Sequence, residues 1–226
     1  MKFLILDIET IPRDDLPNSL DDEVAKKVQQ RVERTGDDPE DAESLIRSVS
    51  PFFGRVLCIG MRLYDEMSGE HKDRVICEED EKATLLKFAE IINHSNSRGL
   101  KFIHYNGLGF DIPFLIIRSA HHGIKIENRK FRNLRRFTYD NHIDLMMFLS
   151  GWSTYNAVSL DIVCQSFGIP SPKEGEVKGD SVATAYNDGE IDLVNEYVMR
   201  DVEATFQLYQ ILLQYLHSVF LFLGLV

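Results

Sequence analysis

The chain has 226 residues, is 44% hydrophobic and carries a formal net charge of -11 at pH 7. This length suits one domain with an insertion, and we expect residues 1–226 to form a single domain. The negative charge argues against sequence-independent coating of nucleic acid, because phosphate binding needs lysines and arginines that face the nucleic-acid backbone. A local basic track is still compatible with the negative net charge. The three cysteines are widely spaced, which argues against a disulfide framework or a zinc site.

The longest apolar run, Val219 to Val226, is far shorter than the roughly 20 residues that a membrane span requires. We therefore expect a cytoplasmic protein without a membrane partner.

Residues 3–8 are almost all apolar, which is typical of a central strand covered on both faces. Successive side chains of a strand alternate between its faces, so Asp7 and Glu9 leave the sheet on the same side. Two like charges one repeat apart repel each other unless protons or cations lie between them, so the pair indicates a cation site. The alternative is a solvated strand end, and matching acids elsewhere would decide between the two.

Residues 13–54 are rich in Asp and Glu and place Val24, Val28 and Val32 at helical spacing. We expect an acidic helical insertion in the sheet. Its charges suit a solvated face, and a lid or a partner surface is the other interpretation.

Further strands are expected at residues 55–64, 73–77 and 100–105, with a helix from Glu78 to about Asn93. Asp111 follows the turn that begins at Asn106 and stands just before Pro113, where a helix can start. That local position is typical of an N-cap, and a metal ligand is the alternative.

Residues 125–137 hold six positive charges and two phenylalanines in an otherwise acidic chain. Arg129, Arg132 and Arg135 in this setting suit the backbone of a single strand, with the aromatic rings as stacking surfaces. A solvated loop face is an equal alternative.

Residues 142–147 predict a short strand that enters a helix, where Asp144 suits a cap or a solvated position better than a ligand. Ser159 to Gly168 has the capping start and the glycine stop of a helix. A last long helix is expected from about Glu190 to Leu216, and it places Tyr197 and Asp201 one turn apart on one face.

Asp7, Glu9, Asp111 and Asp201 arise from a strand, a strand-to-helix junction and a late helix, which converge if the sheet is the core. Four carboxylates suit hard divalent cations, which prefer oxygen ligands. Two such ions can hold an attacking water and the leaving oxygen of a phosphodiester in line. A phenol with an ordinary pKa of about 10 is a poor base at neutral pH, so Tyr197 suits the orienting of that water.

Three motifs in order, Asp7-Ile8-Glu9-Thr10, Asn106 to Asp111, and Tyr197 to Asp201, resemble those of the DEDDy branch of the ribonuclease H-like 3′-5′ exonucleases. The likeness is strongest to predicted exonucleases related to the proofreading domain of family B DNA polymerases. It implies an α/β fold with a mixed sheet of about five strands flanked by helices. It also implies that the four acids ligate two Mg²⁺ or Mn²⁺ ions, and that Tyr197 positions the nucleophilic water.

The same resemblance implies that Thr10 contacts the terminal nucleotide and that Asn106 and Phe110 lie beside the 3′ end. We expect a metal-dependent 3′-5′ exonuclease that releases nucleoside 5′-monophosphates from single-stranded DNA, with a replication or repair protein as its partner. Trimming of RNA is the alternative within this class, because nothing in the sequence shows how the site treats a 2′-hydroxyl. A catalytically silent nucleic-acid-binding or partner-recruiting module is the alternative of another class.

Overall fold

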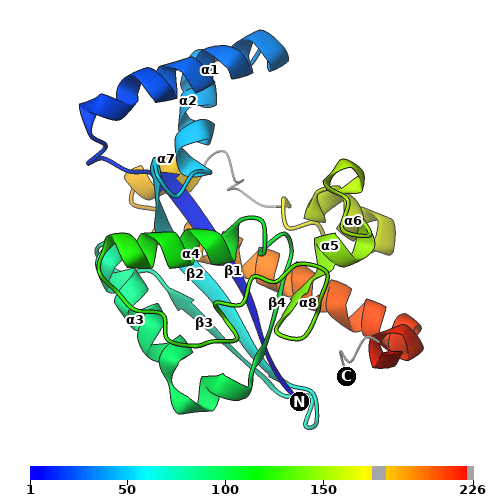
Figure 1. Ribbon diagram of the computed structural model, residues 1–226. Helices are drawn as coiled ribbons and strands as arrows, with labels where there is room; N and C mark the ends of the chain where they lie inside the picture. The colour runs from blue at the N-terminus through cyan, green and yellow to red at the C-terminus, as the bar shows by residue number, and fades with distance from the viewer. Residues whose placement is uncertain (175–181, 223–226) are drawn as a thin grey trace.

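The computed structural model describes residues 1–174 and 182–222, and Figure 1 shows a central sheet with helices on both faces. The strands are β1 (Lys2–Pro12), β2 (Gly54–Asp65), β3 (His71–Ile76), β4 (Lys101–His104) and β5 (His142–Asp144). The helices are α1 (Asp21–Thr35), α2 (Pro39–Ser48), α3 (Glu81–Asn93), α4 (Asp111–His121), α5 (Leu145–Leu149), α6 (Leu160–Phe167), α7 (Val182–Asn187) and α8 (Ile191–Phe222). Short 3-10 helices lie at Asn18–Leu20, Ser95–Gly99 and Thr154–Asn156.

The strand order in the sheet is β3-β2-β1-β4-β5. Strand β2 pairs antiparallel with β1 and β3, whereas β4 pairs parallel with β1 and β5. This arrangement confirms the predicted mixed five-stranded sheet flanked by helices. It places β1 in the middle, so the residues of β1 are covered from both sides.

The two faces of β1 pack against different helices, as the alternation of its side chains requires. Leu4, Leu6 and Ile8 belong to the apolar cluster formed with α3 and α4. Phe3 and Ile5 belong to the cluster formed with α6 and α8. Figure 1 shows α4 in front of the sheet and α8 behind it. The face that begins with Phe3 and Ile5 therefore continues under α8.

Helices α1 and α2 lie between β1 and β2 in the chain, within residues 13–54. Val24 is the buried residue of α1 and Ala42 that of α2. Figure 1 shows α1 standing away from the sheet, with α2 between them. Most side chains of this pair of helices are therefore in contact with solvent.

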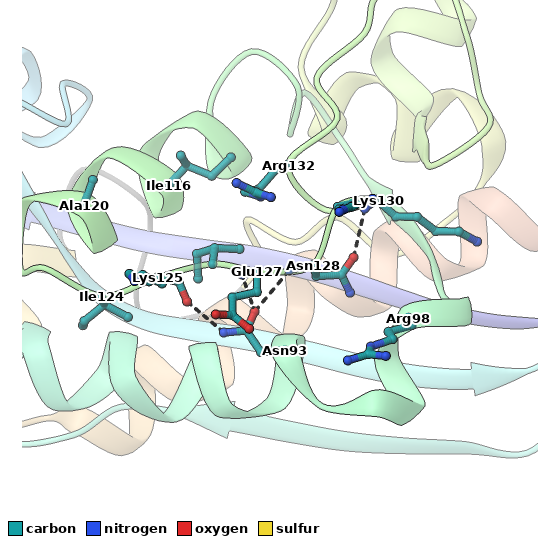
Figure 2. Close-up of a pocket in the computed structure, with 12 residues that line it drawn as sticks. Asn93, Arg98, Ile116, Ala120, Ile124, Lys125, Glu127, Asn128, Lys130 and Arg132 are labelled. Atoms are coloured by element: carbon teal, nitrogen blue, oxygen red, sulfur yellow. Dashed lines mark hydrogen bonds between the residues drawn. The ribbon is translucent and has the colours of Figure 1, made fainter.

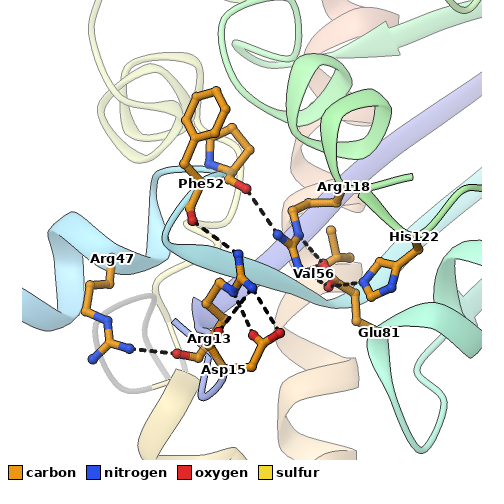
Figure 3. Close-up of polar contacts among 9 residues, drawn as sticks. Arg13, Asp15, Arg47, Phe52, Val56, Glu81, Arg118 and His122 are labelled. Carbon is orange, nitrogen blue, oxygen red and sulfur yellow. Dashed lines mark hydrogen bonds and ion pairs between the residues drawn. The ribbon is translucent and has the colours of Figure 1, made fainter. Parts of the chain in front are cut away.

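The buried Arg13, which directly follows β1, connects the two ends of the segment that carries α1 and α2 (Figure 3). The Arg13 side chain is bound by Asp15 through two hydrogen bonds of 2.7 and 2.9 Å, and it also donates to the Phe52 carbonyl. Arg47 of α2 donates to the Arg13 carbonyl at 2.6 Å. The two arginines, each donating to a backbone carbonyl, therefore hold the start and the end of the segment together.

Cys58, Cys77 and Cys164 are free, as their spacing predicts. Within the described residues, no helix is both long enough and apolar enough to cross a membrane.

Candidate active site

Asp7 and Glu9 lie on β1 on the same face as Phe3 and Ile5, and this face packs under α8. Beyond Ile5, β1 has no partner on the β4 side, because the parallel pairing covers only Phe3 to Ile5. The polar end of β1 is thus open at one edge and covered by a helix above.

Helix α8 reaches the sheet closely beside Asp7 because a glycine stands at the contact. Gly60 of β2 pairs with Asp7 of β1, and a Cβ atom on Gly60 would lie only 2.9 Å from Val198 Cγ2. Val198 neighbours Tyr197 and lies just under one turn from Asp201. The close approach of α8 therefore carries both polar side chains to the carboxylates of β1.

The carboxylates of Asp7, Glu9 and Asp201 have ligand atoms within 4.8 Å of one another. We call this group, together with Asp111, the acidic centre. Among the described residues, no side chain forms a hydrogen bond or a salt bridge with the three clustered carboxylates. The residues fit hard divalent cations, which prefer several carboxylate oxygens and keep some of their waters.

The electrostatics of the acidic centre favour a bound cation. Burial, reinforced by the neighbouring carboxylates, raises the pKa of Asp7 and that of Glu9 well above their ordinary values. Burial and the charge of Asp111 raise the pKa of Asp201 to about 7. Carboxylates that repel each other in a desolvated site are stabilised by protons or metal ions.

Asp111 is the first residue of α4, and the expectation that it caps this helix is wrong. The N-cap position is held by Phe110, whose side chain makes no capping hydrogen bond. The Asp111 carboxylate instead accepts the Ile8 backbone N–H at 3.1 Å, which is the donor that β4 leaves unpaired. Burial raises the pKa of Asp111 to about 6. Asp111 thus lies next to Asp7 but outside the group of three.

Tyr197 is 7% exposed and lies one helical turn before Asp201. Burial, with the charges of Asp201 and Glu9, raises the pKa of its phenol well above the ordinary value. The Arg200 guanidinium lies 5.4 Å from the Tyr197 ring centroid. At neutral pH the phenol therefore keeps its proton and can act as a hydrogen-bond donor.

The segment from Asn106 to Asp111 is held by a buried aspartate that the sequence suggested only as a cap or a solvated residue. Asp144 accepts the backbone N–H groups of Asn106 and Leu108, each at 3.0 Å, and it caps α5 through the Met147 N–H. The cap prediction is confirmed, and the solvated alternative is wrong because Asp144 is fully buried. Asp144 is therefore a structural acid that fixes the approach to Asp111.

Two buried histidines extend this support, and sequence reasoning missed them. His142 Nε2 donates to the Phe131 carbonyl at 2.9 Å, so its Nδ1 accepts from His104 Nε2 at 3.1 Å. His104 Nδ1 in turn accepts the Gly107 N–H at 3.1 Å. Burial and the neighbouring His104 lower the pKa of His142 to about 3, which keeps it neutral in this chain. The sequence signal that could have indicated this pair was the presence of a histidine on each of two predicted strands.

The close contact between the backbone of residue 107 and the His104 ring requires a glycine at this position. A Cβ atom there would lie 2.3 Å from His104 Cγ. Among the described non-glycine residues, positive φ occurs at Asn106, Phe137 and Trp152, and Asn106 has φ 65°. The turn before α4 is therefore fixed by close packing on His104.

The residues expected at the 3′ end lie near Glu9 and Asp111 in the chain. Thr10 follows Glu9 and lines a pocket of about 550 Å³ with residues of α2 and α7. Asn106 and Phe110 bracket the turn into α4, and the Phe110 ring packs on Phe114 at 5.5 Å between centroids. Contact of these three residues with a nucleotide stays a prediction.

The basic stretch forms a loop beside α4, shown in Figure 2. Arg129 and Arg132 line a pocket of about 860 Å³ together with Arg98 and Lys125. Asn93 shapes the loop by donating to the Lys125 carbonyl at 2.8 Å. The pocket thus has several cations in its wall.

Arg135 is exposed and lies further along the same loop, outside the pocket. The idea that both phenylalanines of the stretch act as stacking surfaces is wrong for Phe131, which is fully buried against Phe88 and Phe102. Only Phe137 of the two is exposed.

These features define the class of the fold. It is a mixed five-stranded sheet of the ribonuclease H-like exonuclease type, and acids from β1, α4 and α8 lie at its centre. A family profile described as "Predicted 3′-5′ exonuclease related to the exonuclease domain of PolB" matches residues 53–219. The chain belongs to this family. Membership implies a 3′-5′ exonuclease that depends on divalent metal.

A curated relative, an uncharacterized protein of Methanocaldococcus jannaschii, is 28% identical over 173 residues, which cover 73% of this chain and 89% of the relative. The family B DNA polymerase of Pyrobaculum calidifontis has a similar fold, with a TM-score of 0.59 and 18% identity over 94% of this chain. Exonuclease I of E. coli, solved with a dT13 oligonucleotide, has a TM-score of 0.56 and 11% identity over 98% of this chain. The matched region covers 24% of the polymerase chain and 43% of the exonuclease I chain.

Proposed function

We propose that this protein is a metal-dependent exonuclease that removes nucleoside 5′-monophosphates from the 3′ end of single-stranded DNA. The convergence of Asp7, Glu9 and Asp201 within 4.8 Å carries the proposal, because these carboxylates come from β1 and α8, Glu9 is buried and the other two are half-buried, and none of them forms a salt bridge among the described residues. The family supports the reaction class. The likeness in fold to exonuclease I, which was solved with an oligonucleotide, supports single-stranded DNA as the substrate.

Asp7, Glu9, Asp111 and Asp201 would hold two Mg²⁺ or Mn²⁺ ions. Such a pair of ions would stabilise the attacking and leaving oxygens of an in-line displacement at phosphorus. Asp111 is already oriented by the Ile8 N–H, which leaves its second carboxylate oxygen for this task. In this proposal the protein supplies fixed ligands, and burial keeps competing water away.

Tyr197 would orient the attacking water. Its raised pKa keeps the phenolic proton in place, so the side chain donates a hydrogen bond and does not accept a proton. Its position one turn before Asp201 places it beside the acidic centre. We assign it to the positioning of the nucleophile within the DEDDy pattern.

The substrate would extend from the acidic centre over neighbouring residues. Thr10, Asn106 and Phe110 would meet the terminal nucleotide, because they flank Glu9 and Asp111 in the chain. Arg129, Arg132 and Arg135 would face the phosphates of the strand. Residues 1–226 would act as one exonuclease domain, with residues 13–54 as an insertion.

A labelled-strand assay tests the proposal. A 5′-labelled single-stranded DNA and its RNA counterpart are incubated with wild type or Asp7→Asn in Mg²⁺, in Mn²⁺ and in EDTA. We expect a ladder that shortens from the 3′ end with wild type and metal only, and faster on DNA. Asp14→Asn is the matched control, since Asp14 is an exposed acid near the end of β1.

Absence of cleavage by folded wild type under every condition would contradict the exonuclease assignment and favour the silent binding module. Faster cleavage of the RNA would reassign the substrate to RNA. Equal activity of Asp7→Asn and wild type would contradict the location of the site.

A further inference from the structure

Three aromatic rings gather on the surface where the basic loop meets the end of α5. The Trp152 ring centroid lies 5.1 Å from that of Phe137 and 5.5 Å from that of Tyr139. Tyr139 in turn packs edge-on against Phe148 of α5 at 5.9 Å. Phe137 is 73% exposed, while Trp152 and Tyr139 are half-buried. We call Phe137 and Trp152, supported by Tyr139, the aromatic platform.

The backbone of the platform is held in an unusual conformation. Phe137 has φ 60° and Trp152 has φ 64°, in the left-handed region that side chains other than glycine rarely adopt. Such a conformation is energetically unfavourable for residues with a Cβ atom, so the surrounding structure must impose it. The Trp152 N–H donates to the Met147 carbonyl at 2.8 Å, which fixes the turn after α5. The rings are thus presented in place on the surface.

The charge around the platform is positive, although the chain as a whole is acidic. The Arg136 guanidinium lies 5.8 Å from the Phe137 ring centroid. Arg132 and Arg135 are exposed on the same loop. In the part of the chain that the structure describes, none of these arginines takes part in a salt bridge. Exposed rings next to unneutralised arginines match the bases and phosphates of an unpaired strand.

The loop that carries the platform is fastened to the parts that position the acidic centre. At one end, Phe131 is buried and its carbonyl accepts from His142. At the other end, α5 is capped by Asp144, which also binds the N–H groups of Asn106 and Leu108 ahead of Asp111. The platform is therefore held in a fixed relation to the turn that leads into the acidic centre.

We propose that Phe137 and Trp152 stack with unpaired bases of the nucleic-acid strand whose 3′ end enters the acidic centre, while Arg135 and Arg136 face its phosphates. This inference rests on the proposed function and names a second contact region for the same substrate. Because every base has an aromatic face, the platform would bind single strands with little preference for sequence. It would also bind strands of several nucleotides more tightly than a mononucleotide.

Trp152 is the single tryptophan of the chain, so its fluorescence reports on the platform directly. The experiment titrates a twelve-residue thymidine oligonucleotide into the protein in EDTA, where no cleavage is needed for the signal. We expect saturable quenching with wild type, retained in Phe137→Tyr. For Phe137→Leu we expect an affinity lower by about fivefold to a hundredfold, the range for loss of one stacking partner.

Two controls separate stacking from general effects. Phe52→Leu removes another exposed ring, 62% exposed and remote in sequence, and should bind as wild type does. Inorganic polyphosphate carries the charge without bases and should leave the fluorescence unquenched. Quenching by polyphosphate equal to that by the oligonucleotide, or equal affinity of Phe137→Leu and wild type, would overturn the proposal.

The binding test in EDTA is independent of the nuclease assay. A protein that cleaves DNA but shows no quenching would keep the proposed function and overturn the platform. A protein that shows quenching but never cleaves would keep the platform as a binding surface and contradict the nuclease.

Discussion

Two groups of buried or half-buried carboxylates in this protein have opposite electrostatics. Glu81 is 6% exposed and accepts hydrogen bonds from Arg118 at 2.9 and 2.5 Å and from the Val56 N–H at 2.8 Å, and His122 Nε2 lies 2.7 Å from it (Figure 3). Burial alone would raise the pKa of Glu81, but the bonds from Arg118 and His122 hold it below its ordinary value. The charge of Glu81 is therefore matched within the protein.

In the acidic centre the same kind of side chain has no such match among the described residues. The pKa values of Asp7, Glu9, Asp111 and Asp201 are all raised, with burial as the first cause. Asp144 resembles Glu81, since burial would raise its pKa but the hydrogen bonds that it accepts from backbone N–H groups lower it. Burial of an acid therefore does not by itself indicate a site. Raised pKa values, together with the absence of a salt bridge to these acids among the described residues, distinguish the acidic centre from the structural acids.

The largest expected effect is loss of catalysis in Asp7→Asn. Removing one charged ligand should lower kcat by at least about a thousandfold, because the transition state loses a fixed electrostatic contact. The variant should melt at or above the wild-type temperature in EDTA, since a repelling charge is gone. Steady-state kinetics and thermal melting measure both. Full activity together with unchanged melting would remove Asp7 from the site.

Glu81→Gln should lower stability and leave catalysis unchanged, which is the opposite of the effect expected for Asp7→Asn. It leaves the Arg118 guanidinium without a counter-charge and should lower the free energy of unfolding by about 3 kcal/mol, the lower end for a broken buried ion pair, because the amide keeps an acceptor. The cleavage rate of the folded enzyme should stay within about twofold of wild type. Urea unfolding and kcat are the measurements. A large fall in kcat without loss of stability would mean that Glu81 belongs to the catalytic machinery.

Tyr197→Phe should have a smaller effect on catalysis. It removes one hydrogen-bond donor to the attacking water and should lower kcat by about tenfold to a hundredfold, while KM and Mn²⁺ affinity stay the same. Comparison of kcat and KM separates this role from substrate binding. An increase in KM at unchanged kcat would assign Tyr197 to the substrate.

The smallest expected effect is a pH dependence of stability in EDTA. The pKa of Asp201 is about 7 in the folded chain and ordinarily about 3.9 when unfolded, so its contribution is full below about pH 4 and lost as pH rises through 7. Asp201→Asn should therefore melt as wild type does at pH 4 and several degrees above it at pH 8.

Glu81→Gln is the control for this pH series. The pKa of Glu81 lies below its ordinary value, so its contribution is complete above about pH 4.3 and should not change between pH 5 and 8. A constant difference in melting temperature between Asp201→Asn and wild type across this range would contradict the electrostatics of the acidic centre.

Much of the fold could be predicted from local pattern. The apolar run of β1 and the period of its side chains predict a covered strand with Asp7 and Glu9 on one face. The Ser159 cap and the Gly168 stop predict α6, and Gly168 indeed has φ 69°. These features depend on neighbours in sequence, which is why a single chain shows them.

Features that depend on long-range contacts could not be predicted in this way. Asp111 looks like a cap locally, but its partner is the Ile8 N–H, 103 residues away and free only because β4 is short. Phe131 looks like an exposed ring in a basic loop, but it fills the core beside Phe102. The partners of Glu81 lie on other elements, and no local motif indicates them.

The most direct test of the acidic centre is a count of bound ions at equilibrium. Mn²⁺ is titrated into wild type, Asp7→Asn and Glu81→Gln, and the free ion is followed by electron paramagnetic resonance. We expect about two Mn²⁺ per chain in wild type and in Glu81→Gln, and one or none in Asp7→Asn. Equal Mn²⁺ binding by wild type and Asp7→Asn would contradict a metal site at these carboxylates.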